Sequence, residues 1–463
     1  MANREMKLLT DEQMKAFITD GVLKLKTDFS NEFHARLIEQ LDKVHAEEGN
    51  PGNNILPRIR EMQKVFDHPV ITGALTSVLG PDYVLHTHRH CHFNAAPDPG
   101  SWHKDSYWGY QKIRNHRPWW AMIMYFPQDT PTELGPTGVL PGSHIHETRT
   151  FLEDDVAEEV TAKGEAGTFV LIHYDIWHRS TRNTLGQPRY MLKFEFMRTT
   201  APTVPSWDSQ SREWGEDGEL VPGYQALDAW NWLHGEIGGS YGSHDADPAA
   251  IHQLSEQLNG KDEPVAVEAA YELATCGDAG KTVLLEALRS EDRRASLAAA
   301  YGLTACGEAA VPDLTAALDA KQEHTVNHAL FALGELRHYA ASAVPAIVPL
   351  LAELPTRLRR TAADSLGLIG GASEQSVDGL IACLRDEDEQ VRFTAGLSLA
   401  QLGKAAEKAI PALAEALDDE NRYVRGHAVE ALRYIDTAEA RDILLHELIQ
   451  SRWCVSTTKA STF

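Results

Sequence analysis

The sequence predicts a multidomain protein in which a β-rich N-terminal domain precedes an all-α solenoid. With 463 residues, the chain is long enough to bury two separate hydrophobic cores. Near residue 248 the composition changes from Trp, His, Pro and Gly with short alternating runs to Ala, Leu, Glu and Arg with helical periodicity. The stretch GGSYGSHDADP at this change suits a linker. We therefore expect domains at 1–244 and 245–452 and a tail at 453–463.

The second half repeats itself. Its aligned segments are VEAAYELATCG, SLAAAYGLTACG, NHALFALGELR, RRTAADSLGLIG, RFTAGLSLAQLG and RGHAVEALRYID, which end at residues 277, 307, 337, 370, 403 and 436, in steps of 30, 30, 33, 33 and 33. Between them lie second helices such as AVPDLTAAL and AIPALAEAL, which open with a Pro where a missing N–H costs little. One helical hairpin cannot bury its apolar face alone, so six should stack into a right-handed superhelical solenoid. This pattern resembles HEAT repeats of the short form in the phycocyanobilin-lyase-like group, which implies an interaction surface or scaffold.

Composition limits the functions that the chain can serve. The formal net charge is -24, which repels nucleic acids and anionic membranes. The 5 cysteines are widely spread and never form a CxxC pair, which argues against a disulfide framework or a structural zinc site. No stretch approaches the length of about 18 apolar residues that a membrane span needs. We expect a soluble cytoplasmic protein.

The segment SWHKDSYW carries the first candidate metal ligands. His103 and Asp105 are separated by one residue, so on an extended strand both side chains project from the same face. An iron(II) oxygenase needs two imidazoles and one carboxylate on one face of the metal, with three positions left for co-substrate and O2. The best candidate for the third ligand is His178, in HYDIWHRS, 73 residues after Asp105. Arg189, 11 residues further on, is suited to binding the distal carboxylate of 2-oxoglutarate, and Ser180 is suited to adding a hydroxyl.

These residues resemble the pattern of the phytanoyl-CoA dioxygenase family. The family pattern combines an HxD pair, a PGSH turn, a distal His and an Arg 11 residues on, and this chain has PGSH ending at His144. His173 matches a further family histidine. The resemblance covers most of residues 8–240 and implies a double-stranded β-helix, or jelly roll, that uses iron(II), 2-oxoglutarate and O2. The chain departs from the family at Leu134, where an Asn often precedes the Gly of the turn, and this difference leaves the metal site untouched.

Other polar and aromatic residues near these motifs admit more than one interpretation. His86, His88, His90 and His92 alternate along one predicted strand, but no Cys or carboxylate cluster nearby completes a tetrahedral zinc shell. We interpret the run as a polar strand face at the oxygenase mouth, with His90 and His92 as substrate contacts. Trp108, three residues after Asp105, is a third candidate substrate contact, although such residues more often fill the core.

The main hypothesis is an iron(II)- and 2-oxoglutarate-dependent oxygenase that acts on a small molecule of the natural-product type. Because Asp105 is intact, hydroxylation, desaturation or oxidative ring closure is favoured over halogenation, in which related enzymes replace this carboxylate. The alternative is a partner-recruiting protein whose oxygenase domain modifies a protein bound by the HEAT-like repeats. The repeats are also suited to self-association.

Overall fold

The computed structural model describes residues 5–105, 116–149, 151, 156–215, 223–238, 247–353, 355–370 and 373–450. Trp108 and the predicted tail at 453–463 lie outside these residues. Among the described residues, the chain divides into two compact units, one up to residue 215 and one from residue 223 to residue 450. The segment 223–238 thus groups with the helical unit, and the predicted boundary at 244 and 245 stays a prediction.

The first unit is rich in strands. Its helices are α1 (Asp11–Asp20), α2 (Asn31–Glu48), α3 (Glu61–Phe66) and α4 (Pro69–Leu79), with 3-10 turns η1 (Gly52–Asn54) and η2 (Ser143–Ile145). Its strands are β1 (Val22–Lys26), β2 (Val84–Asn94), β3 (Trp120–Tyr125), β4 (Thr137–Val139), β5 (Val160–Thr161), β6 (Thr168–His173), β7 (His178–Ser180) and β8 (Arg189–Met197). The expected β-rich region with flanking helices is confirmed.

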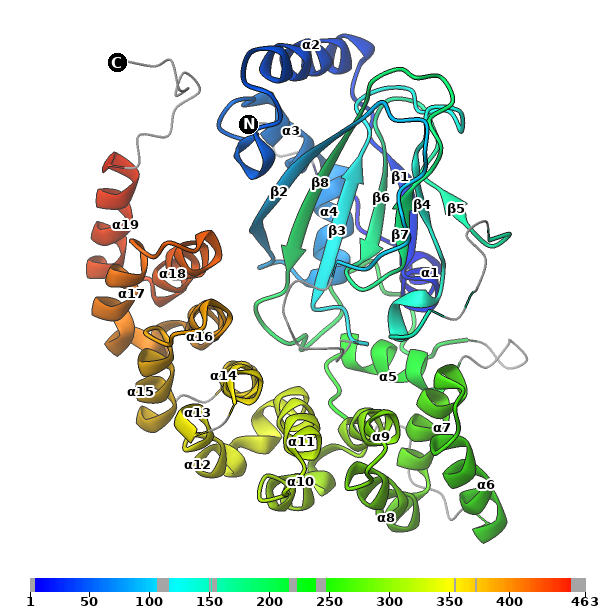
Figure 1. Cartoon of the computed structure of the whole chain (residues 1–463), viewed down its shortest axis with the longest axis vertical. Helices are drawn as coiled ribbons and strands as arrows, with labels where there is room; N and C mark the ends of the chain where they lie inside the picture. Colours follow the sequence, from blue (N-terminus) through cyan, green and yellow to red (C-terminus); the bar gives the residue numbers. More distant parts are fainter. Residues whose placement is uncertain are drawn as a thin grey trace. The chain divides into compact units, whose positions relative to one another are not determined.

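The strands form two antiparallel sheets. The larger sheet has the order β1-β6-β3-β8-β2 and the smaller one the order β5-β4-β7 (Figure 1). Strands β3, β6 and β8 are buried along their whole length, as the apolar runs in the sequence require. Helix α4 packs against β3 and β8 of the larger sheet. The two sheets do not by themselves establish the expected double-stranded β-helix, which stays a prediction.

Strand β2 is irregular where its histidines lie. Its pairing with β8 shifts between Leu85, which faces Phe196, and Arg89, which faces Phe194. Beyond the shift the ladder is regular, and His90 faces Lys193. The irregularity separates the first two histidines of the run from the last two.

The second unit is all-α within the described residues. Its α-helices are α5 (Tyr224–Leu233), α6 (Pro248–Leu258), α7 (Glu263–Thr275), α8 (Gly277–Leu288), α9 (Arg293–Ala305), α10 (Val311–Ala317), α11 (Glu323–Glu335), α12 (Val344–Ile347), α13 (Leu350–Glu353), α14 (Thr356–Ile369), α15 (Glu374–Cys383), α16 (Glu389–Leu402), α17 (Ile410–Ala416), α18 (Arg422–Ile435) and α19 (Ala438–Gln450). Its 3-10 segments are η3 (Gly307–Ala310), η4 (Arg337–Ala343) and η5 (Gly403–Ala409). None of the described helices in the protein is both long and apolar enough to cross a membrane.

The predicted repeats are helical hairpins. Their first helices are α7, α9, α11, α14, α16 and α18, and each of these packs against the next. The final residue of every aligned segment has a positive φ, which reverses the chain after the first helix: 58° at Gly277, 70° at Gly307, 56° at Arg337, 71° at Gly370, 57° at Gly403 and 56° at Asp436. This shared conformation explains why glycine stands at four of the six positions.

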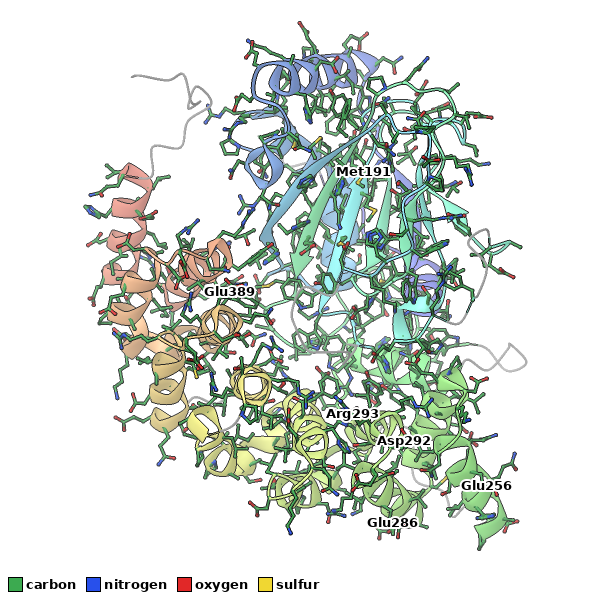
Figure 2. All side chains as sticks on the ribbon, in the orientation of Figure 1. Met191, Glu256, Glu286, Asp292, Arg293 and Glu389 are labelled. Atoms are coloured by element: carbon green, nitrogen blue, oxygen red, sulfur yellow. The ribbon has the colours of Figure 1, made fainter. Side chains whose placement is uncertain are left out.

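Polar side chains fix the turns of these hairpins. The Arg359 guanidinium donates two hydrogen bonds to Asp386, at 2.8 and 2.9 Å, and the Arg392 guanidinium donates two to Asp419, at 2.8 and 3.2 Å, one repeat further on. At the beginning of α9, the carboxylate of Asp292, whose side chain is labelled in Figure 2, accepts from the backbone N–H of Arg294 at 2.9 Å. The Arg–Asp contact thus recurs in two successive repeats, and a capping carboxylate fixes the beginning of α9.

Gly370→Ala tests whether the repeat ends depend on glycine. The residue has φ 71° and ψ -160°, a region that is almost exclusive to glycine, and an added Cβ would have no atom within 4 Å. We expect the helical unit to lose about 1–3 kcal/mol from backbone strain alone. Urea unfolding followed by circular dichroism measures the change. Asp436→Gly is the matched control, because glycine accepts the positive φ of 56° without strain and the exposed ion pair with Arg441 that it removes contributes little to stability. We expect its stability to stay close to that of wild type, and equal stability of the two variants would contradict this account.

The buried histidine of α11 makes the helical unit sensitive to acid. His328 Nδ1 lies 2.8 Å from the Ser296 hydroxyl, and burial lowers the pKa of His328 to about 3. The unfolded chain takes up a proton near the ordinary histidine pKa of about 6.5, whereas the folded chain does not, so stability falls as the pH falls below that value. We expect this residue to account for a loss of about 2 kcal/mol between pH 6.5 and 5. His328→Gln should flatten the dependence of the urea midpoint on pH, and an unchanged slope would contradict the assignment.

Candidate metal centre

Two of the predicted metal ligands are joined through their backbones. The His103 N–H donates to the His178 carbonyl and the His178 N–H donates to the His103 carbonyl, each at 3.0 Å. Residues paired in this way in an antiparallel bridge place their side chains on the same side. Their imidazole rings accordingly lie 4.3 Å apart between centroids. The HxD segment and the segment of His178 are therefore held at one point of the fold.

The orientation of both imidazoles is set by hydrogen bonds to the main chain. His103 Nδ1 lies 2.9 Å from the Ser101 carbonyl and His178 Nδ1 lies 3.1 Å from the Ile176 carbonyl. A proton on Nδ1 satisfies each carbonyl and leaves the Nε2 lone pair available to a metal. Partial burial of this half-exposed ring, and next the neighbouring His178, lower the pKa of His103, which favours the neutral ring that a metal requires.

Asp105 completes the cluster. Its Oδ2 lies 3.2 Å from His178 Nε2 and its Oδ1 lies 3.9 Å from His103 Nε2. Burial by itself would raise the pKa of the carboxyl, but the contact with His178 and the charge of Lys193 lower it well below its ordinary value. One donor atom from each ligand lies within 4.8 Å of the other two, so the three residues could hold a metal ion. Two imidazoles and one carboxylate are the donor set of non-haem iron(II) sites.

The PGSH turn supports both ligand segments. The Ser143 hydroxyl accepts from the Trp177 N–H at 3.0 Å, next to His178, and donates to the Leu140 carbonyl at 2.7 Å. The Lys104 ammonium, next to His103, donates to the Ser143 carbonyl at 2.7 Å. His173 is not part of the metal cluster: its ring lies 4.8 Å from that of His144, at the end of the turn. The turn thus acts through the neighbours of the metal ligands.

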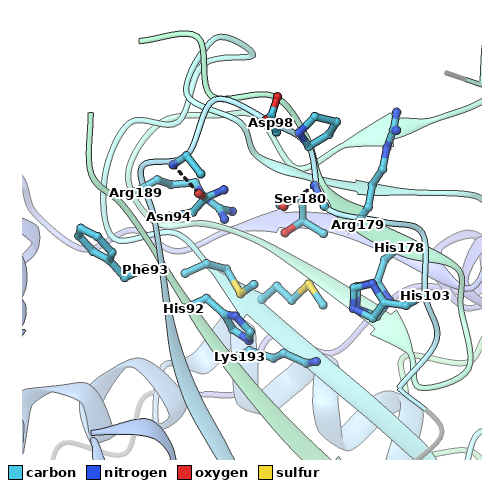
Figure 3. A pocket seen from close by; sticks show the side chains of 16 residues that line it. His92, Phe93, Asn94, Asp98, His103, His178, Arg179, Ser180, Arg189 and Lys193 are labelled. Carbon is cyan, nitrogen blue, oxygen red and sulfur yellow. Dashed lines mark hydrogen bonds between the residues drawn. The ribbon is translucent and has the colours of Figure 1, made fainter. Parts of the chain in front are cut away.

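A cavity of about 340 Å³ lies beside the cluster. It is lined by His92, Phe93, Asn94, Ala96, Asp98, Pro99, Gly100, His103, Met124, Thr137, His178, Arg179, Ser180, Arg189, Met191 and Lys193. His103 and His178 lie on one side of it and Arg189 lies on the other, beside Asn94 (Figure 3). Ser180 lines it as well, with its hydroxyl accepting from the Gly100 N–H at 3.1 Å. Both residues predicted for co-substrate binding therefore face the same cavity as two of the metal ligands.

The predicted substrate contacts are only partly brought together. His92 lines the cavity, whereas His90, whose ring lies 4.5 Å from that of His92, is not among its lining residues. His86 and His88 instead approach the buried Glu195, with Nδ1 of His86 at 3.2 Å and Nε2 of His88 at 3.7 Å. Trp108 lies outside the described residues, so its contact stays a prediction. Within the described part of the chain, the histidine run forms no metal cluster of its own.

Lys193 is a site residue that the sequence analysis missed. It lies on β8, four residues after Arg189, and its buried ammonium contacts Asp105 Oδ2. The segment RYMLKFEFM could have indicated it, because a lysine interrupts an otherwise apolar strand. Its even spacing from Arg189 places both side chains on the same face of the strand. A buried lysine in such a run needs a negative partner.

Loss of one imidazole should abolish tight metal binding. Loss of a residue that only supports a ligand can lower metal affinity by up to about 100-fold, and loss of a ligand itself should cost more. We therefore expect His178→Ala to lower the affinity for Ni(II), a redox-stable substitute for iron(II), by at least about 100-fold. Calorimetric titration of the full chain measures the affinity. His92→Ala is the matched control, because it removes a cavity imidazole that lies outside the cluster; a similar loss in both variants would contradict the ligand assignment.

The comparisons agree with the motifs found in the sequence. Residues 8–191 match the family model for phytanoyl-CoA dioxygenase, and residues 327–400 and 377–453 match that for HEAT repeats. No curated protein matches the chain. The predicted cofactors, iron(II), 2-oxoglutarate and O2, agree with the first match and with the His103–Asp105–His178 cluster.

Solved structures show weak similarity. The nogalamycin-biosynthesis protein SnoN, a non-haem alpha-ketoglutarate-dependent epimerase, is 18% identical with a TM-score of 0.34, over 41% of this chain and 83% of its own. ThoJ, a non-haem monooxygenase in complex with nickel, is 20% identical with a TM-score of 0.33, over 47% and 94%. SnoK, an alpha-ketoglutarate-dependent carbocyclase, is 18% identical with a TM-score of 0.33, over 46% and 92%. At such values these similarities decide nothing about this chain. By its family matches, it carries a phytanoyl-CoA dioxygenase domain in residues 8–191 and HEAT repeats in residues 327–453.

Proposed function

We propose that the N-terminal domain is an iron(II)- and 2-oxoglutarate-dependent oxygenase that hydroxylates, desaturates or oxidatively cyclises a small substrate of the natural-product type. One observation carries the proposal. The cavity has two of the metal-ligating imidazoles on one side and a buried guanidinium, Arg189, on the other. A compound that binds a metal through one end and carries a carboxylate at the other fits both features.

Arg189 is built for an anion that the described protein does not supply. The side chain is buried, with 2% of its surface exposed, and its Nε and Nη1 atoms have no hydrogen-bond partner within the described residues. Burial lowers the pKa of Arg189 to about 10, so the guanidinium remains charged at neutral pH. A buried charge without a partner is costly, and a carboxylate bound through two parallel hydrogen bonds compensates it. The distal carboxylate of 2-oxoglutarate is such a partner.

The metal cluster supplies the other half of the binding. His103, Asp105 and His178 would hold iron(II), which when bound would supply the chemistry for activating O2 together with 2-oxoglutarate. The backbone pairing of the histidines fixes the direction of two ligands, and Ser180 offers a hydroxyl to the same cavity. Met124 and Met191 are among the apolar residues of the lining, which limit the water around the reacting groups.

The position and size of the cavity support a small ligand in a double-stranded β-helix. Its lining combines residues of β2, β3 and β8 from the larger sheet with residues of β4 and β7 from the smaller one. A cavity between two antiparallel sheets is what a jelly roll provides. Its volume of about 340 Å³ lies at the small end of the range of ligand sites.

The presence of Asp105 limits the types of reaction that we propose. Because its carboxylate is available as the third ligand, no position is left vacant there for a halide. The proposal therefore keeps hydroxylation, desaturation and ring closure and excludes halogenation. These three outcomes share the same metal site and differ in how the substrate lies.

A protein substrate remains the second candidate because the chain carries HEAT repeats, which often mediate protein interactions. The two candidates differ in what stimulates turnover. Succinate release that responds to low-molecular-weight extract favours a metabolite, whereas release that responds only to a protein fraction favours a partner bound by the repeats.

Arg189→Met tests the proposed function directly. The iron-loaded full chain should convert 2-oxoglutarate to succinate, measured by mass spectrometry, even without its substrate in a slow uncoupled reaction. Loss of two charge-assisted hydrogen bonds should raise KM for 2-oxoglutarate by about 100-fold or more. Arg182→Met, which removes an exposed arginine outside the cavity lining, should leave KM unchanged. A wild-type protein that binds iron(II) but never forms succinate with any extract would refute the proposal.

A further inference from the structure

We infer that Lys193 is a positioning residue that binds one oxygen of Asp105 and so leaves only the other oxygen to the metal. The inference rests on the proposed function and concerns how this chain keeps coordination positions open for 2-oxoglutarate and O2. It assigns a task to a buried charge that the ligand set itself does not explain.

The contacts of Asp105 differ between its two oxygens. Oδ2 contacts the Lys193 ammonium and lies 3.2 Å from His178 Nε2, whereas the nearest ion-pair contact of Oδ1 is His103 Nε2 at 3.9 Å. Lys193 and Asp105 are both buried, with 3% and 8% of their surfaces exposed. Because the pair is buried, few water molecules compete for the hydrogen bonds of the ammonium. The contact between Lys193 and Asp105 is therefore strong and directional.

The number of oxygens that Asp105 offers decides how many positions remain. An octahedral iron(II) would have six positions, of which two imidazoles and one carboxylate oxygen would take three. Two-point binding of 2-oxoglutarate would take two more and leave one for O2. If Asp105 bound through both oxygens, that last position would be lost or 2-oxoglutarate would be displaced.

The location of the lysine is otherwise unfavourable. An ammonium beside a divalent cation is repelled by it, and a buried ammonium is costly without a partner. Lys193 faces His90 across the β2–β8 ladder, and among the described residues its ion-pair partner is Asp105. Because that partner is a metal ligand, the charge acts on the metal through the carboxylate.

The experiment compares the full chain with Lys193→Met, which has a similar length but no donor and no charge. Lys193→Gln is a second neutral variant, one atom too short for the same contact, and Lys193→Arg retains charge and donor. Crystal structures of the Ni(II)-loaded proteins show how many oxygens of Asp105 bind the metal. Anaerobic titration of the iron(II) proteins with 2-oxoglutarate, followed by the visible charge-transfer band, gives Kd.

We expect both neutral variants to bind the metal through both oxygens of Asp105 and to raise Kd for 2-oxoglutarate by at least about 10-fold, with Lys193→Arg within about threefold of wild type. One-oxygen binding in the neutral variants overturns the inference even if Kd rises, because the lysine then acts through charge alone. An unchanged Kd also overturns it. A wild-type chain that binds neither Ni(II) nor 2-oxoglutarate would instead refute the proposed function.

Discussion

The hydrogen-bonded backbone pair of His103 and His178 is the constraint on which the candidate site depends. These residues are 75 positions apart in the chain, yet two hydrogen bonds of 3.0 Å fix their separation and direction. The pairing continues at Gly100, whose N–H donates to the Ser180 carbonyl at 2.9 Å. A Cβ at Gly100 would lie 2.7 Å from the Ser180 hydroxyl, so any larger residue there would displace this hydroxyl, which lines the cavity. The site is thus built from main-chain geometry, which side-chain motion does not loosen.

The cluster of candidate metal ligands could be predicted because their chemistry is visible in local spacing. An HxD pair needs only an extended backbone to point both groups the same way, and His178 and Arg189 followed in the order of the family pattern. The function of the PGSH turn could not be predicted, because the bonds from Ser143 to Leu140 and Trp177 and the support that it gives to Lys104 appear only when the chain is folded. Lys193 was missed for a related reason. Its partner Asp105 lies 88 residues away.

The repeats show the opposite case. Their contacts join helices that are close in the sequence. The 30- and 33-residue steps were therefore enough to predict that each repeat stacks on the next. The positive φ at the aligned ends was also implicit in the recurring glycine, although Arg337 and Asp436 show that the conformation is kept where glycine is absent. By contrast, perfect alternation in LHTHRHCHF suggested one regular strand, and the register shift before Arg89 divides it. Local pattern predicts which face a side chain prefers but not where a ladder slips.

The charges of the cavity explain how an acidic protein can bind an acid. The chain has a net charge of -24, so a dicarboxylate is repelled by the molecule as a whole. Within the cavity, however, the charges are arranged differently. Glu159 neutralises Arg179 through contacts of 2.9 and 2.6 Å, and Asp105 neutralises Lys193, whereas Arg189 has no carboxylate partner among the described residues. Burial removes the water that would screen Arg189, so its attraction for a carboxylate in the cavity is strong. The repulsion between the carboxylate and the surface charges acts over a longer distance and is weakened by salt. In the proposed function, this guanidinium, rather than the overall charge, therefore selects the anion that the cavity retains.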